Sequence, residues 1–302
     1  FKNYDYEIIL KLINKEFPNS NITSDEINKI VNKFRFEYYF YNSLLKLKKP
    51  KIIFVTQNGL QKGLFKAAKK NHIHLVEVQH GLINENHLAY NYNKNITYKA
   101  DQIHLPDYFF IFSEFWTRNI YYPVNRILEI GNSFLFNSFK IKSKKNGLLV
   151  VSADIYADNL KKITIDLVKK NYDKPIYFKL HPNQFNEKDY FTKEFSSYKN
   201  IHVISFEKNI NELLKLSKAT LVINSTVIYE TLQNKNIGII YKKKSFFEHS
   251  NIFNNPNVYL VDNATDLMNV LSKSTYKILS HNDLFFKDFD NKLFNSFIKN
   301  LD

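Results

Sequence analysis

The residues best suited to chemistry lie at three places where a predicted strand ends and polar residues follow it. These strand ends are Ser152-Ala153-Asp154, His181-Pro182-Asn183 and Asn224-Ser225-Thr226. A proline disfavours helix at the residue before it, so His181 should be extended at the end of the strand 176–180. In an open α/β sheet, ligands bind at the carboxyl ends of the strands. The sequence therefore predicts one ligand site that these three strand ends share.

The third strand end has residue types that can hold a phosphate. Ser225 or Thr226 can cap a predicted helix at 227–234, and the exposed N–H groups at that end attract an anion. Ordinary N-caps have the same composition, so this turn alone does not indicate a site. Glu230 lies one turn into the helix, where it could reach two ribose hydroxyls or simply face solvent. The coincidence of a cap with a histidine at another strand end favours a nucleotide site.

Two strand ends in the first half of the chain carry matching candidates. They are Gln57-Asn58-Gly59 and Gln79-His80-Gly81, where Gly81 permits a tight turn that would bring His80 close to a ligand. A long predicted loop at 82–105 contains Glu85, and loops of that length are usually functional or mobile. His80 and Glu85 are therefore candidates for a general base opposite the nucleotide.

The elements that must position these residues form two successive α/β halves. Continuous apolar runs predict strands at 51–56, 74–79, 108–112, 126–130, 147–151, 176–180, 201–204, 220–223, 237–241 and 258–261. Helical spacing predicts helices near 4–17, 24–47, 60–70, 156–171, 209–217, 227–234, 264–272 and 283–300, and another from Ser113. A lysine-rich linker at 138–146 would separate domain 1–140 from domain 141–302. We predict an α/β protein of two Rossmann-like domains that face each other across a cleft.

The composition limits the partners and the compartment. A net charge of +14 over 302 residues favours an anionic partner such as a nucleic acid, a sugar nucleotide or an acidic bilayer. No nucleic-acid-binding motif is present, so we expect no nucleic-acid partner. The absence of cysteine excludes disulfides and thiolate metal sites and fits a cytoplasmic protein. No apolar run of about 18 residues predicts a membrane span. The first residue is Phe1, which suggests a piece of a longer protein.

No metal or cofactor motif is found. A Walker loop, a GxGxxG motif and an HExxH motif are all absent from the sequence. The remaining histidines of the first half are scattered rather than arranged as ligands, at His72, His74, His87 and His104. We therefore expect a metal-independent protein without a bound cofactor.

The order of the second-half motifs resembles a known family. Lys179-x-His181-Pro182, followed 44 residues later by Ser225-Thr226 and then Glu230, resembles the nucleotide-binding half of bacterial GT-B glycosyltransferases. The similarity is greatest to enzymes that use CMP-activated sialic or Kdo-type acids in capsule and lipopolysaccharide assembly. Gln79-His80-Gly81 is similar to the Kdo-transferase side of that group. CDP-glycerol glycerophosphotransferases share a similar His-Pro and serine pattern.

This resemblance implies roles for the candidate residues. His181 would contact the donor phosphate and could protonate the departing CMP, while Ser225 and Thr226 would hold the same phosphate and Glu230 would lie near the ribose. The donor site would also include Ser152, Lys179, Pro182, Asn183 and Asn224.

Asp154 would then be the carboxylate that acts on the sugar, with Asp158 as the fallback. It would be the nucleophile in a retaining reaction, whereas in an inverting reaction a carboxylate would deprotonate the acceptor. Glu85 or His80 would be the base on the acceptor side. The first half lacks the paired acidic motif of sialyltransferases, which argues against their mechanism.

The sequence thus predicts a glycosyltransferase that moves an acidic sugar from a CMP-sugar to a bacterial surface glycan or glycolipid. Its basic residues would attract the donor and allow peripheral contact with the anionic inner membrane. A CDP-glycerol glycerophosphotransferase or a UDP-sugar enzyme of the same fold is the alternative among enzymes. A non-catalytic binding module of a larger assembly protein is the alternative from another class.

Overall fold

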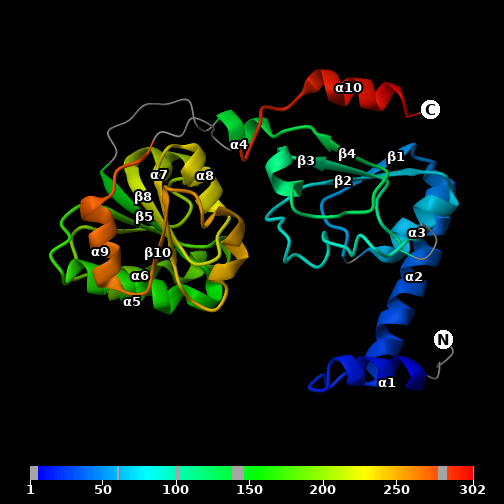
Figure 1. The fold of residues 1–302 in the computed structure, drawn as a ribbon, viewed down its shortest axis with the longest axis horizontal. Helices are drawn as coiled ribbons and strands as arrows, with labels where there is room; N and C mark the ends of the chain where they lie inside the picture. Colours follow the sequence, from blue (N-terminus) through cyan, green and yellow to red (C-terminus); the bar gives the residue numbers. More distant parts are fainter. Residues whose placement is uncertain (1–5, 60, 99–102, 138–145, 278–283, 302) are drawn as a thin grey trace.

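The protein consists of two α/β lobes, shown in Figure 1 as a computed structural model. The structure describes residues 6–59, 61–98, 103–137, 146–277 and 284–301. Each lobe is built around its own parallel sheet, of four strands in the first and six in the second. The predicted fold class is therefore confirmed.

The first sheet has its strands in chain order. Its strands are β1 (Ile52–Val55), β2 (His74–Val78), β3 (Tyr108–Ile111) and β4 (Arg126–Glu129). Two helices, α2 (Ser24–Lys48) and α3 (Lys62–Lys70), pack together in this lobe, and α3 contacts β2. Gly63 allows the close approach of the two helices, since a Cβ there would lie 2.4 Å from the Cβ of Glu37. The preceding helix, α1 (Glu7–Glu16), buries none of its residues.

The second sheet has the order β10-β9-β8-β5-β6-β7. Its strands are β5 (Gly147–Val151), β6 (Ile176–Lys179), β7 (Ile201–Ile204), β8 (Ser217–Val222), β9 (Ile237–Tyr241) and β10 (Val258–Val261). Its helices are α5 (Ala157–Val168), α6 (Lys188–Glu194), α7 (Ile210–Leu216), α8 (Val227–Gln233) and α9 (Ala264–Lys273). The direction of winding reverses between the neighbours β5 and β8. A parallel sheet opens a crevice at the carboxyl ends of such a pair.

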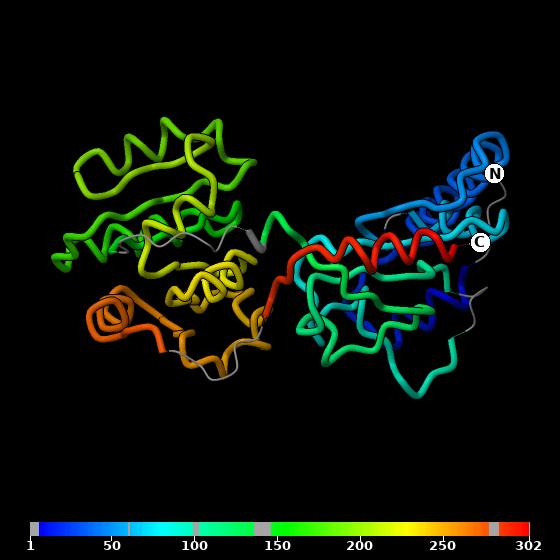
Figure 2. Tube along the Cα trace, turned by 90° about the horizontal axis from the view of Figure 1, so that it is seen from above, coloured from blue at the N-terminus to red at the C-terminus, as the bar shows by residue number. Residues whose placement is uncertain are grey.

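Two segments connect the lobes. The short helix α4 (Ser133–Asn137) follows the first sheet, and most of the predicted linker, residues 138–145, lies outside the described residues. The last helix, α10 (Asn291–Lys299), returns to the first lobe, as Figures 1 and 2 show. Its Phe297 packs with Val76, Phe110 and Leu128 of the first sheet.

The placement of α10 differs from the predicted division at residue 140. Domain 141–302 was expected to keep all of its helices, but the apolar side of α10 packs on a face of β2, β3 and β4. Two local expectations also differ. The predicted helix from Ser113 is one 3₁₀ segment, η1 (Glu114–Thr117), and α6 was not predicted.

Candidate functional site

The carboxyl ends of β5 and β6 bring the predicted histidine and aspartate together. Asp154 opens the 3₁₀ segment η2 (Asp154–Tyr156) after β5, and His181 follows β6 and precedes η3 (Pro182–Glu187). The Nδ1 atom of His181 lies 3.1 Å from Oδ1 of Asp154. The side chains of His181 and Asp154 are 44% and 43% exposed, so a ligand can reach both.

Asn183 completes this cluster. Its Nδ2 donates to Oδ2 of Asp154 at 2.9 Å, so both carboxylate oxygens have partners. Its backbone N–H also donates to Nδ1 of His181, at 3.3 Å. The contacts with Asp154 and with this N–H both engage Nδ1. Asp154 thus orients the imidazole and leaves Nε2 as the nitrogen that can approach a ligand.

Behind this cluster, a buried hydrogen bond fixes the two strand ends. Ser152 donates from Oγ to Oε1 of Gln184 at 2.7 Å, and both side chains are buried. Ser152 therefore anchors η3 beneath His181 instead of facing solvent. Gln184 was not predicted, and its position three residues after His181 in a polar stretch was the only signal in the sequence.

The third predicted strand end follows β8. Ser225 accepts the backbone N–H of Val227 at 3.4 Å, whereas Thr226 occupies the N-cap position without a side-chain capping bond. Glu230 is one turn further along α8, and burial raises the pKa of its carboxyl group to about 7. Asn224, Ser225 and Thr226 all lie partly exposed in this turn.

A tyrosine that sequence reasoning missed crosses this turn. The hydroxyl of Tyr156, after β5, lies 2.6 Å from Oγ of Ser245, after β9. Because β8 lies between β5 and β9 in the sheet, this contact runs past the end of β8.

Two residues that were predicted for the donor site instead make contacts outside it. The Nζ atom of Lys179 donates to the carbonyl oxygen of Ser205 and lies 4.9 Å from the ring centre of Phe185, and burial lowers the pKa of this lysine. Lys179 thus joins β6 to the loop after β7. The fallback carboxylate, Asp158, pairs with Lys161 at 3.2 Å on the exposed side of α5.

Of the candidates in the first lobe, Glu85 contacts the second lobe. Glu85 is exposed and accepts from Oγ of Ser250 at 3.2 Å, across the two lobes. It also lines a polar cavity of about 130 Å³ with Arg118 and Asn251. His80 is exposed at the end of β2. Nothing lies within 4 Å of a Cβ built on Gly81, so the expected tight approach of the chain at this glycine is not found.

A buried carboxylate that was not predicted fastens these loops. Glu77, in β2, accepts hydrogen bonds from the hydroxyls of Tyr90 at 2.6 Å and Tyr122 at 2.7 Å. Asn58 donates to the Tyr122 hydroxyl at 2.7 Å, which connects the loop after β1. Burial raises the pKa of Glu77 and the two tyrosine hydroxyls oppose that rise. Glu77 therefore joins the loops that follow three successive strands.

The lobes contact each other through α8 and the segment before α10. Trp116 of η1 packs against Tyr229 of α8 with the rings tilted by 55° and their centres 4.6 Å apart. The carbonyl oxygen of Phe285 accepts from Nε1 of Trp116 at 2.7 Å, while Gln233 of α8 accepts the N–H of Phe285 at 3.0 Å. The helix that carries Glu230 is thus coupled to the first lobe.

Within the described residues, no group of three or more His, Asp or Glu side chains could hold a metal ion. No described helix is long and apolar enough to cross a membrane.

Comparison with known proteins places the fold. No protein-family model matches the chain, and no curated protein matches it in sequence. The solved UDP-GlcNAc 2-epimerase of Methanocaldococcus jannaschii, in complex with UDP-GlcNAc and UDP, is 18% identical with a TM-score of 0.54, over 88% of this chain and 80% of that one.

Two other solved structures are similar. A glycosyltransferase from Rickettsia africae is 16% identical with a TM-score of 0.50, over 87% of this chain and 76% of that one. The UDP-GlcNAc 2-epimerase of Neisseria meningitidis, bound to UDP-GlcNAc, is 15% identical with a TM-score of 0.53, over 89% of this chain and 80% of that one. The chain therefore has the two-lobed fold of GT-B glycosyltransferases and UDP-GlcNAc 2-epimerases.

Proposed function

We propose that the protein is a glycosyltransferase that takes its sugar from a nucleotide sugar bound in the crevice of the second lobe. One observation carries this proposal: His181, oriented by Asp154, lies close to where the strand order reverses. That is where doubly wound sheets bind nucleotides. The solved structures of the same fold that hold UDP-GlcNAc support it.

In this proposal each strand end has one task. His181 binds the donor phosphate through Nε2 and can protonate the departing nucleotide. The turn at Asn224, Ser225 and Thr226 holds the same phosphate, and Glu230 accepts the ribose hydroxyls. Asp154 acts as a positioning residue for His181, because both of its carboxylate oxygens are engaged by His181 and Asn183.

The acceptor side belongs to the first lobe. Glu85 contacts the second lobe, His80 is exposed at the end of β2, and either can take the proton of the attacking hydroxyl. The reaction needs no metal ion in this proposal, since an imidazolium can neutralise the leaving phosphate.

For the nucleotide, the motif resemblance favours CMP attached to an acidic sugar, whereas the solved neighbours of the fold hold UDP or UDP-GlcNAc. We propose a pyrimidine nucleotide donor, with CMP-linked Kdo or sialic acid as the first candidate and a UDP-sugar as the second. Thermal unfolding with CMP, CDP, UDP and UDP-GlcNAc checks this. Stabilisation by UDP without CMP would exclude the CMP-sugar, and no stabilisation by any of them would contradict a nucleotide site.

Epimerisation is the second candidate reaction, because two of the similar structures are UDP-GlcNAc 2-epimerases. An epimerase changes the sugar without an acceptor. Proton NMR of UDP-GlcNAc incubated with the protein alone would separate the two reactions. A new sugar nucleotide at equilibrium would indicate epimerisation, whereas release of the nucleotide only with an acceptor would indicate transfer.

We also propose that the acceptor is held at an anionic bilayer. One stripe of α2 is apolar and exposed, and its members Phe36, Tyr39, Phe40, Leu44 and Leu47 are between 37% and 77% accessible. The exposed lysines Lys46, Lys48 and Lys49 adjoin its end. Apolar side chains flanked by lysines are typical of helices that lie in a membrane interface. Cosedimentation with anionic vesicles, but not with neutral ones, is expected, and Phe40→Ser should reduce it. Dimerisation of the protein through this stripe, without vesicle binding, would contradict the proposed membrane contact.

A further inference from the structure

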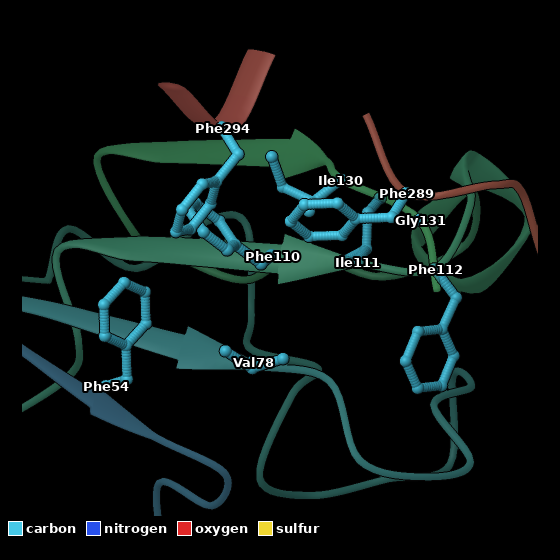
Figure 3. Close-up of a pocket in the computed structure, with 9 residues that line it drawn as sticks. All are labelled: Phe54, Val78, Phe110, Ile111, Phe112, Ile130, Gly131, Phe289 and Phe294. Atoms are coloured by element: carbon cyan, nitrogen blue, oxygen red, sulfur yellow. The ribbon is translucent and has the colours of Figure 1, made fainter. Parts of the chain in front are cut away.

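A second cavity lies in the first lobe between its sheet and the C-terminal segment, as Figure 3 shows. It has a volume of about 260 Å³. Eight apolar side chains and one glycine line it, namely Phe54, Val78, Phe110, Ile111, Phe112, Ile130, Gly131, Phe289 and Phe294. In Figure 3, Phe289 and Phe294 come from the C-terminal segment, and the other side chains come from the sheet and its strand ends.

Backbone hydrogen bonds fix the segment that forms one wall of this cavity. The N–H of Asn132 donates to the carbonyl oxygen of Lys287 at 2.8 Å, and the N–H of Asp290 donates to Ile130 at 2.8 Å. Gly131 has a φ of +77°, and a Cβ there would lie 2.1 Å from the carbonyl oxygen of Asp288. The segment before α10 is therefore fixed to the end of β4, which sets how near Phe289 and Phe294 can come to the sheet.

The side chains that line the cavity determine which kind of ligand it can bind. No charged or polar side chain takes part, so a hydrocarbon without charge is the matching ligand. An apolar cavity of roughly 150 Å³ takes up one benzene molecule. By that scale, a cavity of about 260 Å³ holds roughly ten carbon atoms.

The cavity lies beside an acceptor-side candidate. Val78, at the end of β2, lines it, and the ladder continues because the N–H of Gln79 donates to Phe110 at 2.8 Å. Side chains two residues apart in an extended chain share one face. His80 lies two residues beyond Val78, just past the carboxyl end of β2.

We propose that this cavity binds the first part of the hydrocarbon chain of a lipid-linked acceptor. The chain is held between α10 and the sheet, and the acceptor hydroxyl is thereby presented beside His80. This inference rests on the proposed transferase function for its purpose, but the binding of the chain can be measured without any reaction.

The binding test uses titration calorimetry with n-octyl β-D-glucoside, below the concentration at which it forms micelles, and methyl β-D-glucoside as the control without a chain. The octyl compound should bind at least about tenfold more tightly, because each buried methylene strengthens binding roughly fourfold. Val78→Phe fills the cavity and should abolish this difference. Phe294→Ala removes a half-buried wall on α10 and should weaken binding if Val78→Phe fails to fold.

Leu44→Ser on α2 is the matched control, because the exposed stripe there is another place where an alkyl chain could bind. This variant should keep the octyl binding. If Leu44→Ser removes the binding while Val78→Phe and Phe294→Ala keep it, the cavity is not the site and the proposal is overturned. Equal affinity of the octyl and methyl compounds overturns it as well.

A transfer assay separates this proposal from the proposed function. With methyl, butyl and octyl glycosides of one sugar as acceptors, KM should fall as the chain grows in the native protein and stay constant in Val78→Phe. Nucleotide stabilisation in Val78→Phe should equal that of the native protein, since the crevice lies in the other lobe. A chain that binds without transfer to any acceptor would contradict the transferase function, whereas transfer with a KM independent of the chain would contradict the cavity.

Discussion

The two sheets are both parallel, yet they distribute their helices differently. The strands of the first lobe lie in chain order, and right-handed crossovers place all of their connections on one face. The helix α10 packs on the opposite face. In the second lobe the strand order reverses between β5 and β8. Helices therefore cover both faces of this sheet, and ligands of such sheets bind at the carboxyl ends of the two strands at the reversal.

This difference indicates which lobe can bind the nucleotide and which can place the acceptor. The second lobe brings polar residues together at its strand ends, around His181 and Asp154. The first lobe has no reversal, and it buries a carboxylate, Glu77, within the sheet to hold its loops. We therefore expect the second lobe to decide nucleotide binding and the first to decide how the acceptor is placed.

The largest expected effect separates the two lobes by activity. His181→Ala should lower both transfer and donor hydrolysis by about 10² to 10⁴, the usual contribution of a positioned general acid. His80→Ala should lower transfer more than hydrolysis, because water needs no positioning by the acceptor side. Rates with and without acceptor check this. A loss of hydrolysis in His80→Ala as large as in His181→Ala would contradict the division of tasks.

The next prediction compares how much one buried polar group in each lobe contributes to stability. Glu77→Ala leaves the hydroxyls of Tyr90 and Tyr122 without their acceptor and should lower the free energy of unfolding by about 2–5 kcal/mol. The matched variant in the second lobe is Thr220→Val, since Oγ1 of Thr220 is buried without a hydrogen-bond partner in the described structure. It should leave stability unchanged or raise it. Urea denaturation measures both, and an equal loss in the two variants would contradict the role of Glu77.

A pH effect follows for Glu230. Burial raises its pKa in the folded protein to about 7, from 4.5. The folded state then binds more protons than the unfolded state between these values, so stability falls as the pH rises from about 4.5 to 7, by at most about 3 kcal/mol. Glu230→Gln should remove this decline. Unfolding temperatures of both proteins at pH 5 and pH 8 check it, and parallel curves would contradict a raised pKa of Glu230.

The smallest effect compares two tightly packed glycines. A Cβ at Gly63 would meet backbone atoms of Phe34 and Tyr38 at 2.7 Å, whereas one at Gly238 would meet only the end of the Ile228 side chain at 2.7 Å. Gly63→Ala should therefore cost about 1–3 kcal/mol, and Gly238→Ala less, because a side chain can rotate away. Thermal unfolding measures both. The reverse order would show that α2 shifts easily against α3.

Much of the fold was predictable because strands and helices follow from local patterns. The apolar runs located all ten strands that the described residues form, and the X-Pro step put His181 at a strand end. The loops and short helices were harder. Neither η3 nor α6 has enough apolar periodicity to stand out, and the apolar side of α10 does not by itself show which sheet the helix packs on.

The sequence by itself determined the types of residue at the strand ends, since alternation and turn propensity act over a few positions. Only the tertiary structure decided which of them meet. Asp154 lies 27 residues from His181 in the chain, and the structure brings its carboxylate to 3.1 Å from the imidazole. Glu77 binds Tyr122 across 45 residues. Such pairs depend on strand order and register, which no local pattern specifies.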